Sequence, residues 1–501
     1  MKKIQTINLA VCKITPEVLR LVPVELMKKH SFVPFDFSDE RLSIAIANPK
    51  DSSVLDDIQV ITGLDVDAFQ ASREMIWKRI EDALPGLYAS GEVKEIVLNG
   101  AEESEIEHGI SKTVDQVIRQ AVERLASDIH IEPQETSLYV RFRIDGVLST
   151  ICKYSKAVQP SFTARIKVMA GMDITERRLP QDNQFSQYLD HRNIDFRVST
   201  LPGKYGEKVV IRVLDKSSFA LDLSRLGMDT DIQTSFEAMI QNPQGLILVT
   251  GPTGSGKTTT LYSVLNRLTS PEKNIITLED PVEYELLAGK ATGLGITQVH
   301  VNSKIGMTFT VGLKASLRQD PDIIMVGEIR DRETAEIAMK SALTGHLVLS
   351  TLHTNDSFST LIRLRDMGVE PYLIAATVTG IMAQRLVRVL CPQCKEAYHP
   401  PAKVLKLLFP GTSSAAHEGT LYRAKGCESC RNIGYRGRKG IYELLAMNDD
   451  LAACLKAGLD LRAAYETSKT AILKTMRSSG LDLVSQGLTT VEEVFRTTIE
   501  A

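Results

Sequence analysis

The sequence predicts a multidomain α/β protein with a largely parallel, doubly wound sheet in its second half. Three observations support this fold class. The chain has 501 residues, enough for about three or four domains. Continuous apolar runs at 245–250, 323–326 and 347–350 are typical of strands buried on both faces. Helical patterns separate these runs, and such strand–helix units favour a parallel sheet.

The predicted domains follow one another along the chain. Residues 1–84 alternate helical and strand patterns and predict a small α/β domain, which is interpreted as a partner-binding domain. Residues 85–112 carry several glycines and an acidic stretch, which indicates a linker. Residues 113–220 predict a helix followed by alternating strands, with Asp145-Gly146 as a hairpin turn. The remaining predicted parts are the strand–helix domain at 221–385, a cysteine-bearing subdomain at 386–440 and a mainly helical region at 441–501.

Composition excludes several classes of protein. The formal net charge is -3 and 43% of the residues are hydrophobic, which argues against a fibrous or disordered chain. This near-neutral charge provides no general attraction to nucleic acid, so no direct nucleic-acid binding is expected. The start of the chain is too polar for a secretory signal, and the apolar stretch 372–383 is too short to span a bilayer. We therefore expect a cytoplasmic protein that meets a membrane only through partners.

The strongest motif is a phosphate-binding loop of the form G-x-x-x-x-G-K-[ST]. It follows one of the buried strands and precedes a predicted helix, which is the context that this motif requires. Glycines allow successive backbone N–H groups to face one anion, the lysine reaches the β- and γ-phosphates, and the hydroxyl after it ligates magnesium. The predicted nucleotide-binding residues are Gly251, Pro252, Thr253, Gly254, Ser255, Gly256, Lys257, Thr258 and Thr259, with Thr258 as the magnesium ligand.

Four further polar residues lie near predicted strand ends. Glu279 and Glu328 follow apolar strands, where carboxylates enter the crevice that binds ligands in such sheets. His346 precedes the last apolar run and His353 follows it. Each of these residues alone is equally compatible with a solvated or structural role. Behind a phosphate loop, they together predict a catalytic set, and the absence of an Asn-Lys-x-Asp motif favours ATP over GTP.

Four of the seven cysteines form two C-x-x-C pairs. Two such pairs are typical of a structural zinc site with four thiolate ligands. Two unrelated pairs or a redox pair are the alternatives, and the second pair makes the redox interpretation weaker. The predicted zinc ligands are Cys391, Cys394, Cys427 and Cys430.

In combination, these motifs resemble the secretion ATPase superfamily, specifically the ATPases of type II secretion and type IV pilus assembly. The segments 279–283, 327–328 and 344–356 resemble that family's Asp box, Walker B motif and His box. The upstream segments that also match are 126–133, 176–182 and 205–208. The resemblance covers the chain from about residue 12.

The resemblance implies a hexameric ATPase with a RecA-like domain at 221–385, preceded by a PAS-like α+β domain at 113–220. ATP would lie between these two domains, and Arg197 and Arg212 would reach its phosphates. By the same resemblance, Glu279 would activate water and Glu328 would orient magnesium with its water shell, although the two roles could be exchanged.

The resemblance also implies partners. A homo-hexamer would act peripherally at the inner membrane, on a platform protein and other inner-membrane assembly proteins, to extend a pilus or a secretion pseudopilus. The rival functions are a retraction motor, a DNA-uptake motor and a nucleotide-gated scaffold with little turnover.

The chain departs from the family pattern in three places. Residues 286–296 form a segment longer than usual, which we interpret as a surface insertion. Lys314 stands where the family usually has arginine. The N-terminal domain lacks the repeats with which some relatives bind cyclic di-GMP, so that ligand is not expected.

Overall fold

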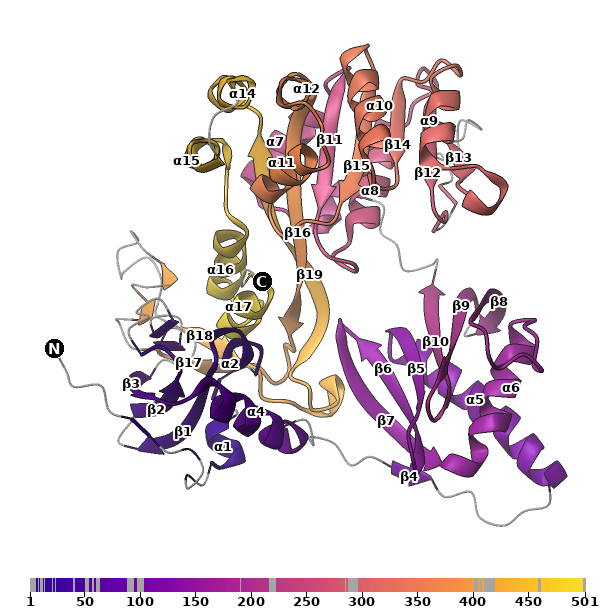
Figure 1. The fold of residues 1–501 in the computed structure, drawn as a ribbon, viewed down its shortest axis with the longest axis vertical. Coiled ribbons are helices and arrows are strands. Elements are labelled where there is room, and N and C mark those ends of the chain that lie inside the picture. Colours follow the sequence, from indigo (N-terminus) through magenta and orange to yellow (C-terminus); the bar gives the residue numbers. More distant parts are fainter. Residues whose placement is uncertain are drawn as a thin grey trace. The chain divides into compact units, whose positions relative to one another are not determined.

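The structure is a computed structural model of the chain, and it divides into two compact units. One unit comprises residues 1–88 together with 220–501, and the other comprises residues 89–219 (Figure 1). The description covers residues 6–498 apart from the following: 8, 10–11, 13, 20, 23, 39–40, 50–53, 56–57, 60–63, 88–93, 97–102, 190, 216–221, 284, 287–295, 401–403, 406–407, 410–419 and 458–460.

A seven-stranded sheet organises the larger unit and confirms the predicted parallel arrangement. Its order is β13-β12-β14-β15-β11-β16-β19, and every neighbouring pair is parallel except β16 and β19. Its central strands are fully buried, as their apolar runs predicted. The strands are β11 (Gly245–Thr250), β12 (Ile275–Glu279), β13 (Thr297–His300), β14 (Ile323–Val326), β15 (Leu347–Leu352), β16 (Val378–Leu390) and β19 (Tyr435–Ala446).

Helices cover both faces of this sheet. Helices α7 (Thr230–Ile240) and α8 (Lys257–Leu268) bury apolar side chains against one face. The opposite face packs against α9 (Phe309–Ser316), α10 (Arg332–Leu343), α11 (Ser357–Asp366) and α12 (Pro371–Thr377). Apolar burial on both sides explains why the central strands carry almost no polar residues before their carboxyl ends.

The chain end packs along the long β16–β19 pair. The four helices there are α14 (Asp449–Lys456), α15 (Leu461–Ala471), α16 (Met476–Ser485) and α17 (Val491–Thr498). The cysteine-bearing segment lies between the two long strands and contains a small hairpin of β17 (Glu396–Tyr398) and β18 (Leu421–Arg423). Both β16 and β19 cross the limits that we expected for this subdomain, since β16 continues to Leu390 and β19 begins at Tyr435.

The N-terminal part of the same unit has a small three-stranded sheet of order β1-β2-β3. Its strands are β1 (Phe32–Ser38), β2 (Arg41–Ile46) and β3 (Asp65–Gln70), and its helices are α1 (Pro16–Leu19), α2 (Val24–His30) and α4 (Arg73–Leu87). The alternation over Arg41–Ile46 places Leu42 and Ile44 in the core.

The smaller unit is a second seven-stranded sheet of order β4-β7-β6-β5-β10-β9-β8, covered on one face by α5 and α6. Asp145 and Gly146 have φ values of 48° and 83°, so they form the predicted tight turn between β6 and β7. The elements are β4 (Lys94–Ile96), α5 (Glu103–Glu123), β5 (Ala126–Pro133), β6 (Ser137–Ile144), β7 (Val147–Ser155), α6 (Gln159–Met169), β8 (Gln181–Leu189), β9 (Arg192–Gly203) and β10 (Gly206–Asp215).

The expected linker at 85–112 contains secondary structure. Strand β4 pairs with β7, and α5 begins at Glu103 rather than near residue 114. Glu103 and Glu105, which suggested a linker, therefore belong to a long helix.

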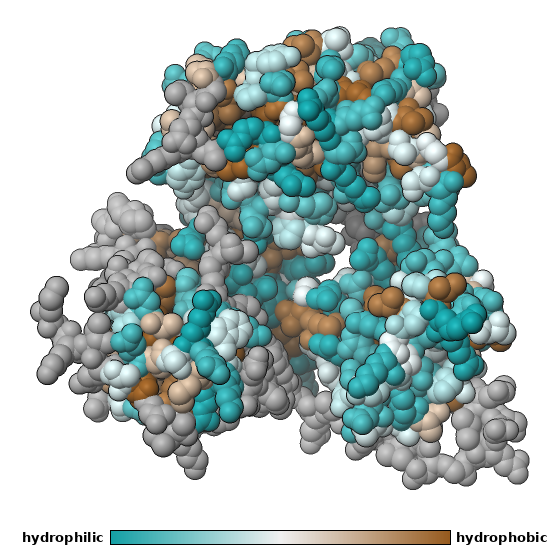
Figure 2. Space-filling view, viewed as in Figure 1, coloured by the Kyte–Doolittle hydropathy of each residue, from teal (hydrophilic) through white to brown (hydrophobic). Residues whose placement is uncertain are grey.

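No helix in the described part of the chain combines the length and the apolar character needed to cross a bilayer. On the face shown in Figure 2, hydrophobic residues occur in separate patches among hydrophilic ones.

A buried ion-pair cluster fixes α17 to β16. Glu493, whose side chain is fully buried, accepts hydrogen bonds from Arg388 at 2.8 Å and from Arg496 at 2.6 Å. Burial alone would raise the pKa of Glu493, but the hydrogen bonds from Arg496 and Arg388 outweigh it and lower the pKa to about 2. The carboxylate therefore stabilises the fold at neutral pH, and this contribution is lost as the pH falls from about 4.5 toward 2.

Replacing this buried carboxylate should reduce stability strongly. We expect Glu493→Gln to lower the free energy of unfolding by about 3 kcal/mol at pH 7, because two arginines lose their buried counter-charge. Urea unfolding at pH 7 and at about pH 3.5 should show a smaller difference from the wild type at the acidic pH. The exposed pair of Glu466 with Lys469 provides the control, since Glu466→Gln should change little. Equal effects of the two substitutions would contradict the assignment.

Candidate functional site

The carboxyl ends of four neighbouring strands form the candidate site. Strands β12, β14, β15 and β11 are adjacent and parallel, so the segments that follow them emerge at one edge of the sheet. They deliver Glu279, Glu328, His353 and the glycine-rich loop before Lys257. This arrangement brings together most of the residues that the sequence predicted.

The glycine-rich loop has the shape of an anion-binding turn. Gly251, Gly254 and Gly256 have φ values of 147°, 79° and 93°, a region that other residues rarely adopt. A Cβ atom on Gly251 would lie 2.4 Å from the backbone oxygen of Gln384. Helix α8 starts directly after the loop, and the Thr258 hydroxyl-bearing side chain at its first turn is exposed. This hydroxyl is therefore accessible to a magnesium ion.

Lys257 is held inside the loop. Its Nζ donates hydrogen bonds to the carbonyl oxygens of Gly251 at 2.7 Å and Pro252 at 3.1 Å, and lies 3.5 Å from Nδ1 of His353. Burial lowers the pKa of Lys257 to about 8, although the charge of Glu328 opposes this shift. The ammonium group therefore loses its proton more easily than an exposed lysine, and an incoming phosphate would favour the charged form.

Glu328 and His353 complete the polar group beside Lys257. The carboxylate of Glu328 pairs with Arg330 and lies 3.7 Å from Nε2 of His353. Burial and the neighbouring charge of Lys257 lower the pKa of His353, so its ring is neutral at pH 7. His353 thus lies between a cation and a carboxylate.

Glu279 occupies a different environment from Glu328. Only 4% of Glu279 is exposed, whereas the Glu328 side chain is 20% exposed and paired with arginine. Hydroxyl and amide groups surround Glu279, with Tyr262 as one of the donors.

The structure does not bring His346 to this edge. His346 precedes β15, so it lies at the opposite end of the strand from His353, and its Nδ1 lies 2.9 Å from the carbonyl oxygen of Ser341. A strand of this length separates the two residues by about 20 Å. Within one chain, the two histidines therefore lie at opposite ends of β15, and a catalytic role for His346 stays a prediction.

Arg197 and Arg212 lie in the smaller unit, on the sheet face that the helices leave uncovered. They are directly opposite one another in the β9–β10 register, where two like charges destabilise the pair. Asp128 lies 3.3 Å from Arg212 and 3.7 Å from Arg143, so it compensates part of this repulsion. Two arginines side by side on an exposed sheet face are a chemistry that attracts anions.

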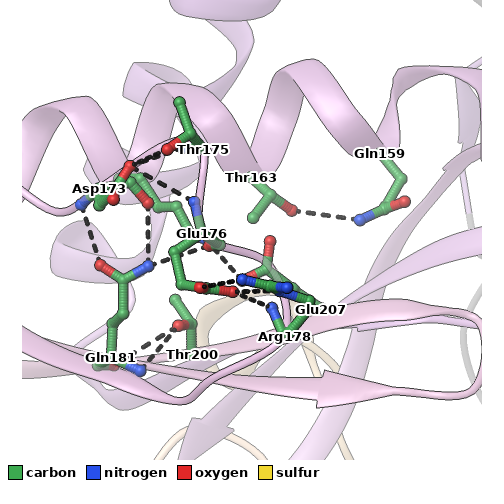
Figure 3. A network of polar contacts seen from close by, with 10 residues as sticks. Gln159, Thr163, Asp173, Thr175, Glu176, Arg178, Gln181, Thr200 and Glu207 are labelled. Atoms are coloured by element: carbon green, nitrogen blue, oxygen red, sulfur yellow. Dashed lines mark hydrogen bonds and ion pairs between the residues drawn. The ribbon is translucent and has the colours of Figure 1, made fainter.

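Two motifs of the smaller unit, 176–182 and 205–208, are joined by polar contacts. Lys167, which is 1% exposed, pairs with Glu207 at 2.6 Å and donates to the carbonyl oxygen of Glu176. Figure 3 shows how Asp173, Glu176 and Gln181 hold the loop before β8 through hydrogen bonds to one another. Residues of the 176–182 motif therefore stabilise the conformation of the loop before β8. Gln159, Thr163, Arg177 and Glu207 help to line a neighbouring cavity of 180 Å³.

The four paired cysteines form one cluster. Their Sγ atoms all lie within 4.8 Å of one another, with separations of 3.9 Å for Cys391–Cys427 and 3.6 Å for Cys394–Cys430. A tetrahedral zinc site with bonds of about 2.3 Å has edges of about 3.8 Å, so these thiols fit such an ion.

Backbone donors support the thiolate form of one member of this cluster, Cys430. The N–H groups of Cys427 and Gly434 each lie 3.2 Å from Sγ of Cys430. Burial raises the pKa of Cys430, but these and neighbouring hydrogen bonds outweigh it and lower the pKa to about 6. The sulfur set could therefore hold a metal ion.

Sequence reasoning missed residues that support the site. Gln384, which is 2% exposed, donates to the carbonyl oxygen of Ser255 at 2.8 Å and accepts from Thr260 at 2.7 Å. In the sequence, Gln384 stands out only as a single amide residue directly after the apolar stretch 372–383.

One departure from the family pattern can be placed in full. Lys314 pairs with exposed Glu333, and most of the segment 286–296 lies outside the described residues.

Comparison with known families agrees with this geometry. The family described as "Type II/IV secretion system protein" matches residues 103–496, and the MshEN domain matches residues 3–87. The chain belongs to the Type II/IV secretion system protein family.

Curated relatives of this secretion family member align over nearly its whole length. The Type II secretion system ATPase E of Vibrio cholerae is 43% identical over 483 residues, which cover 96% of this chain and 90% of the relative. The type IV pilus assembly ATPase PilB of Myxococcus xanthus is 41% identical, covering 98% of this chain and 88% of the relative. The solved structure of the Legionella pneumophila ATPase DotB shares the fold, with 19% identity and a TM-score of 0.57 over 81% of this chain and 98% of that chain.

Nucleotide binding should be coupled to protonation of Lys257. With a pKa of about 8 before binding, the lysine should take up roughly 0.5 proton at pH 8 and roughly 0.1 at pH 7 when ATP binds. Calorimetric titration with ATP in buffers of different ionisation enthalpy measures this uptake.

Two variants identify the group that takes up this proton. Lys257→Arg should abolish the uptake because arginine remains charged at both pH values. His353→Gln should retain it. Loss of the uptake in His353→Gln would show that the proton goes to the histidine and would contradict the assignment.

Proposed function

We propose that this secretion family member is a hexameric ATPase that powers the assembly of a type II secretion pseudopilus or a type IV pilus. The convergence of the phosphate loop, Glu279, Glu328 and His353 at one sheet edge carries the proposal. Family membership and the full-length similarity to ATPases of both systems support it.

The chemistry follows from the residues at this edge. The backbone N–H groups of the loop and Lys257 would bind the β- and γ-phosphates of ATP, and the Thr258 hydroxyl would hold magnesium. Magnesium, when bound, neutralises charge on the phosphate oxygens. Glu279 would position the attacking water, and Glu328 would orient the hydrated ion after release from Arg330. His353 would connect Glu328 with Lys257.

The smaller unit would supply the remaining positive charge. We infer that it is a PAS-like domain and that the larger sheet is RecA-like, with ATP between two such domains. The neighbouring positions of Arg197 and Arg212 on one sheet face support this role, since adjacent guanidinium groups attract an anion. The partners of the whole protein would be the other subunits of the ring and an inner-membrane platform protein. The protein would act in the cytoplasm, at the inner membrane.

The four thiols are proposed to hold one structural zinc ion. Their separations match the edges of a zinc–thiolate tetrahedron, and four protein ligands leave no open position for catalysis. The ion would fix the turn between β16 and β19.

Hydrolysis should require an assembled ring. We expect the specific ATPase activity to rise steeply with protein concentration, and Glu328→Gln and Arg212→Ala to lower it by roughly 10³-fold. The steady-state rate at increasing protein concentrations measures this, with the exposed Arg365→Ala as the control. Tight ATP binding without turnover would favour a scaffold, and activity that is independent of concentration and of Arg212 would refute the interfacial role of that arginine.

The zinc assignment predicts a metal content of about one ion per chain. Elemental analysis of the purified protein should find this ion, and Cys427→Ser should lose it and lower the thermal unfolding temperature. Cys454→Ser should retain the ion, because that buried cysteine lies in α14 and not in the cluster. Zinc content that is unchanged in Cys427→Ser would exclude the four-thiol site.

A further inference from the structure

Glu279 lies at the centre of a buried hydrogen-bond network. Its Oε1 accepts from the Thr277 hydroxyl at 2.6 Å and from Nε2 of Gln298 at 3.1 Å, and its Oε2 accepts from the Tyr262 hydroxyl. Thr277 precedes Glu279 by two residues on β12, and Gln298 is directly opposite Thr277 in the β12–β13 register. All three donors therefore approach the carboxylate on one face of the sheet.

Two of the three donors are themselves held in place. The side-chain oxygen of Gln298 accepts the N–H of Leu286 at 2.7 Å, so its NH₂ group must face Glu279. Tyr262 is 0% exposed and lies on the core-facing side of α8, the helix that starts at Lys257. The network thus joins Glu279 to the phosphate-loop helix and to the chain that follows β12.

The number of donors limits what Glu279 can still bind. A carboxylate offers about four acceptor positions, two on each oxygen. Thr277 and Gln298 occupy both positions on Oε1, and Tyr262 occupies one on Oε2. Among the residues that the structure describes, no other donor reaches this carboxylate, so one acceptor position on Oε2 remains, which is enough for a single water molecule.

The donors are neutral, so they fix the carboxylate without cancelling its charge. Among the described residues, no salt bridge involves Glu279, whereas Arg330 compensates Glu328. A buried carboxylate that has uncharged donors and one open acceptor position is suited to orienting a water molecule toward a phosphate.

We propose that Tyr262, Gln298 and Thr277 are positioning residues for ATP hydrolysis, which direct the single open acceptor position of Glu279 at the attacking water. This inference rests on the proposed function, since it assigns a supporting shell to the same reaction.

The test compares Tyr262→Phe with a matched control in the full-length protein. Tyr262→Phe removes one hydroxyl and keeps the buried ring, so kcat should fall roughly 10- to 100-fold while the Kd for ATP changes less than about twofold. Tyr442→Phe removes another buried hydroxyl, one that donates to the carbonyl oxygen of Leu226, and should leave kcat unchanged. Both variants should lose similar thermal stability.

A second pair of variants covers the case in which Tyr262→Phe does not fold. Thr277→Val should lower kcat in the same way, whereas Thr377→Val should not, because the Thr377 hydroxyl only bonds to the carbonyl oxygen of Leu373 in its own helix. In a Glu279→Gln background, Tyr262→Phe or Thr277→Val should cause less than about a twofold further loss, because both act through Glu279.

Three results would overturn the inference. The first is equal kcat values for each variant and its control. The second is a loss that is additive with Glu279→Gln. In both of these cases wild-type turnover persists, so the proposed ATPase function stands. The third is a wild type that binds ATP without hydrolysing it, which would refute the proposed function and the positioning role together.

Discussion

Parallel pairing of β12, β14, β15 and β11 is the constraint on which the site depends. Parallel strands all end at the same edge, so four segments separated by up to about a hundred residues in the chain meet there without any direct sequence link. Apolar burial on both faces keeps polar residues out of the strands and leaves them to the carboxyl ends. The same rule that concentrates Glu279, Glu328 and His353 at one edge excludes His346, which enters the strand from the other edge.

The polar groups at this edge differ in how their charges are compensated. Lys257 is surrounded by backbone carbonyls and a neutral histidine, and burial lowers its pKa. Glu328 already has an arginine partner, whereas Glu279 is held by neutral donors. Before nucleotide binds, the site thus combines a lysine that readily loses its proton with a carboxylate whose hydrogen-bond donors are all uncharged. The phosphates of ATP would complement Lys257, and a hydrated magnesium ion would complement the carboxylate. The site is thus organised in advance for a charged ligand.

The sequence predicted the parts of the fold that have strong periodicity. Apolar runs identified β11, β14 and β15, and the turn chemistry of Asp145-Gly146 identified a hairpin. The start of α5 was not predicted, because Glu103 and its neighbours resemble a charged linker until the rest of the helix packs. The separation of His346 from His353 could be predicted from the sequence, because the strand between them is about 20 Å long. Tyr262 and Gln384 could not be recognised, because their roles depend on partners far along the chain.

The long β16–β19 pair connects the phosphate loop with the cysteine cluster. Gln384 on β16 binds the loop at Ser255, and the same strand reaches Arg388, which α17 holds through Glu493. The strand ends immediately before Cys391. A Cβ atom on Gly256 would lie 2.8 Å from Nε2 of Gln384, so the loop and the strand fit only in close contact. A shift of the phosphate loop on binding ATP must therefore either displace β16 or break its bond to Gln384. The buried ion-pair cluster of Glu493 with Arg388 and Arg496 holds the far end of the same strand, so β16 is tied to the phosphate loop at one end and to α17 at the other.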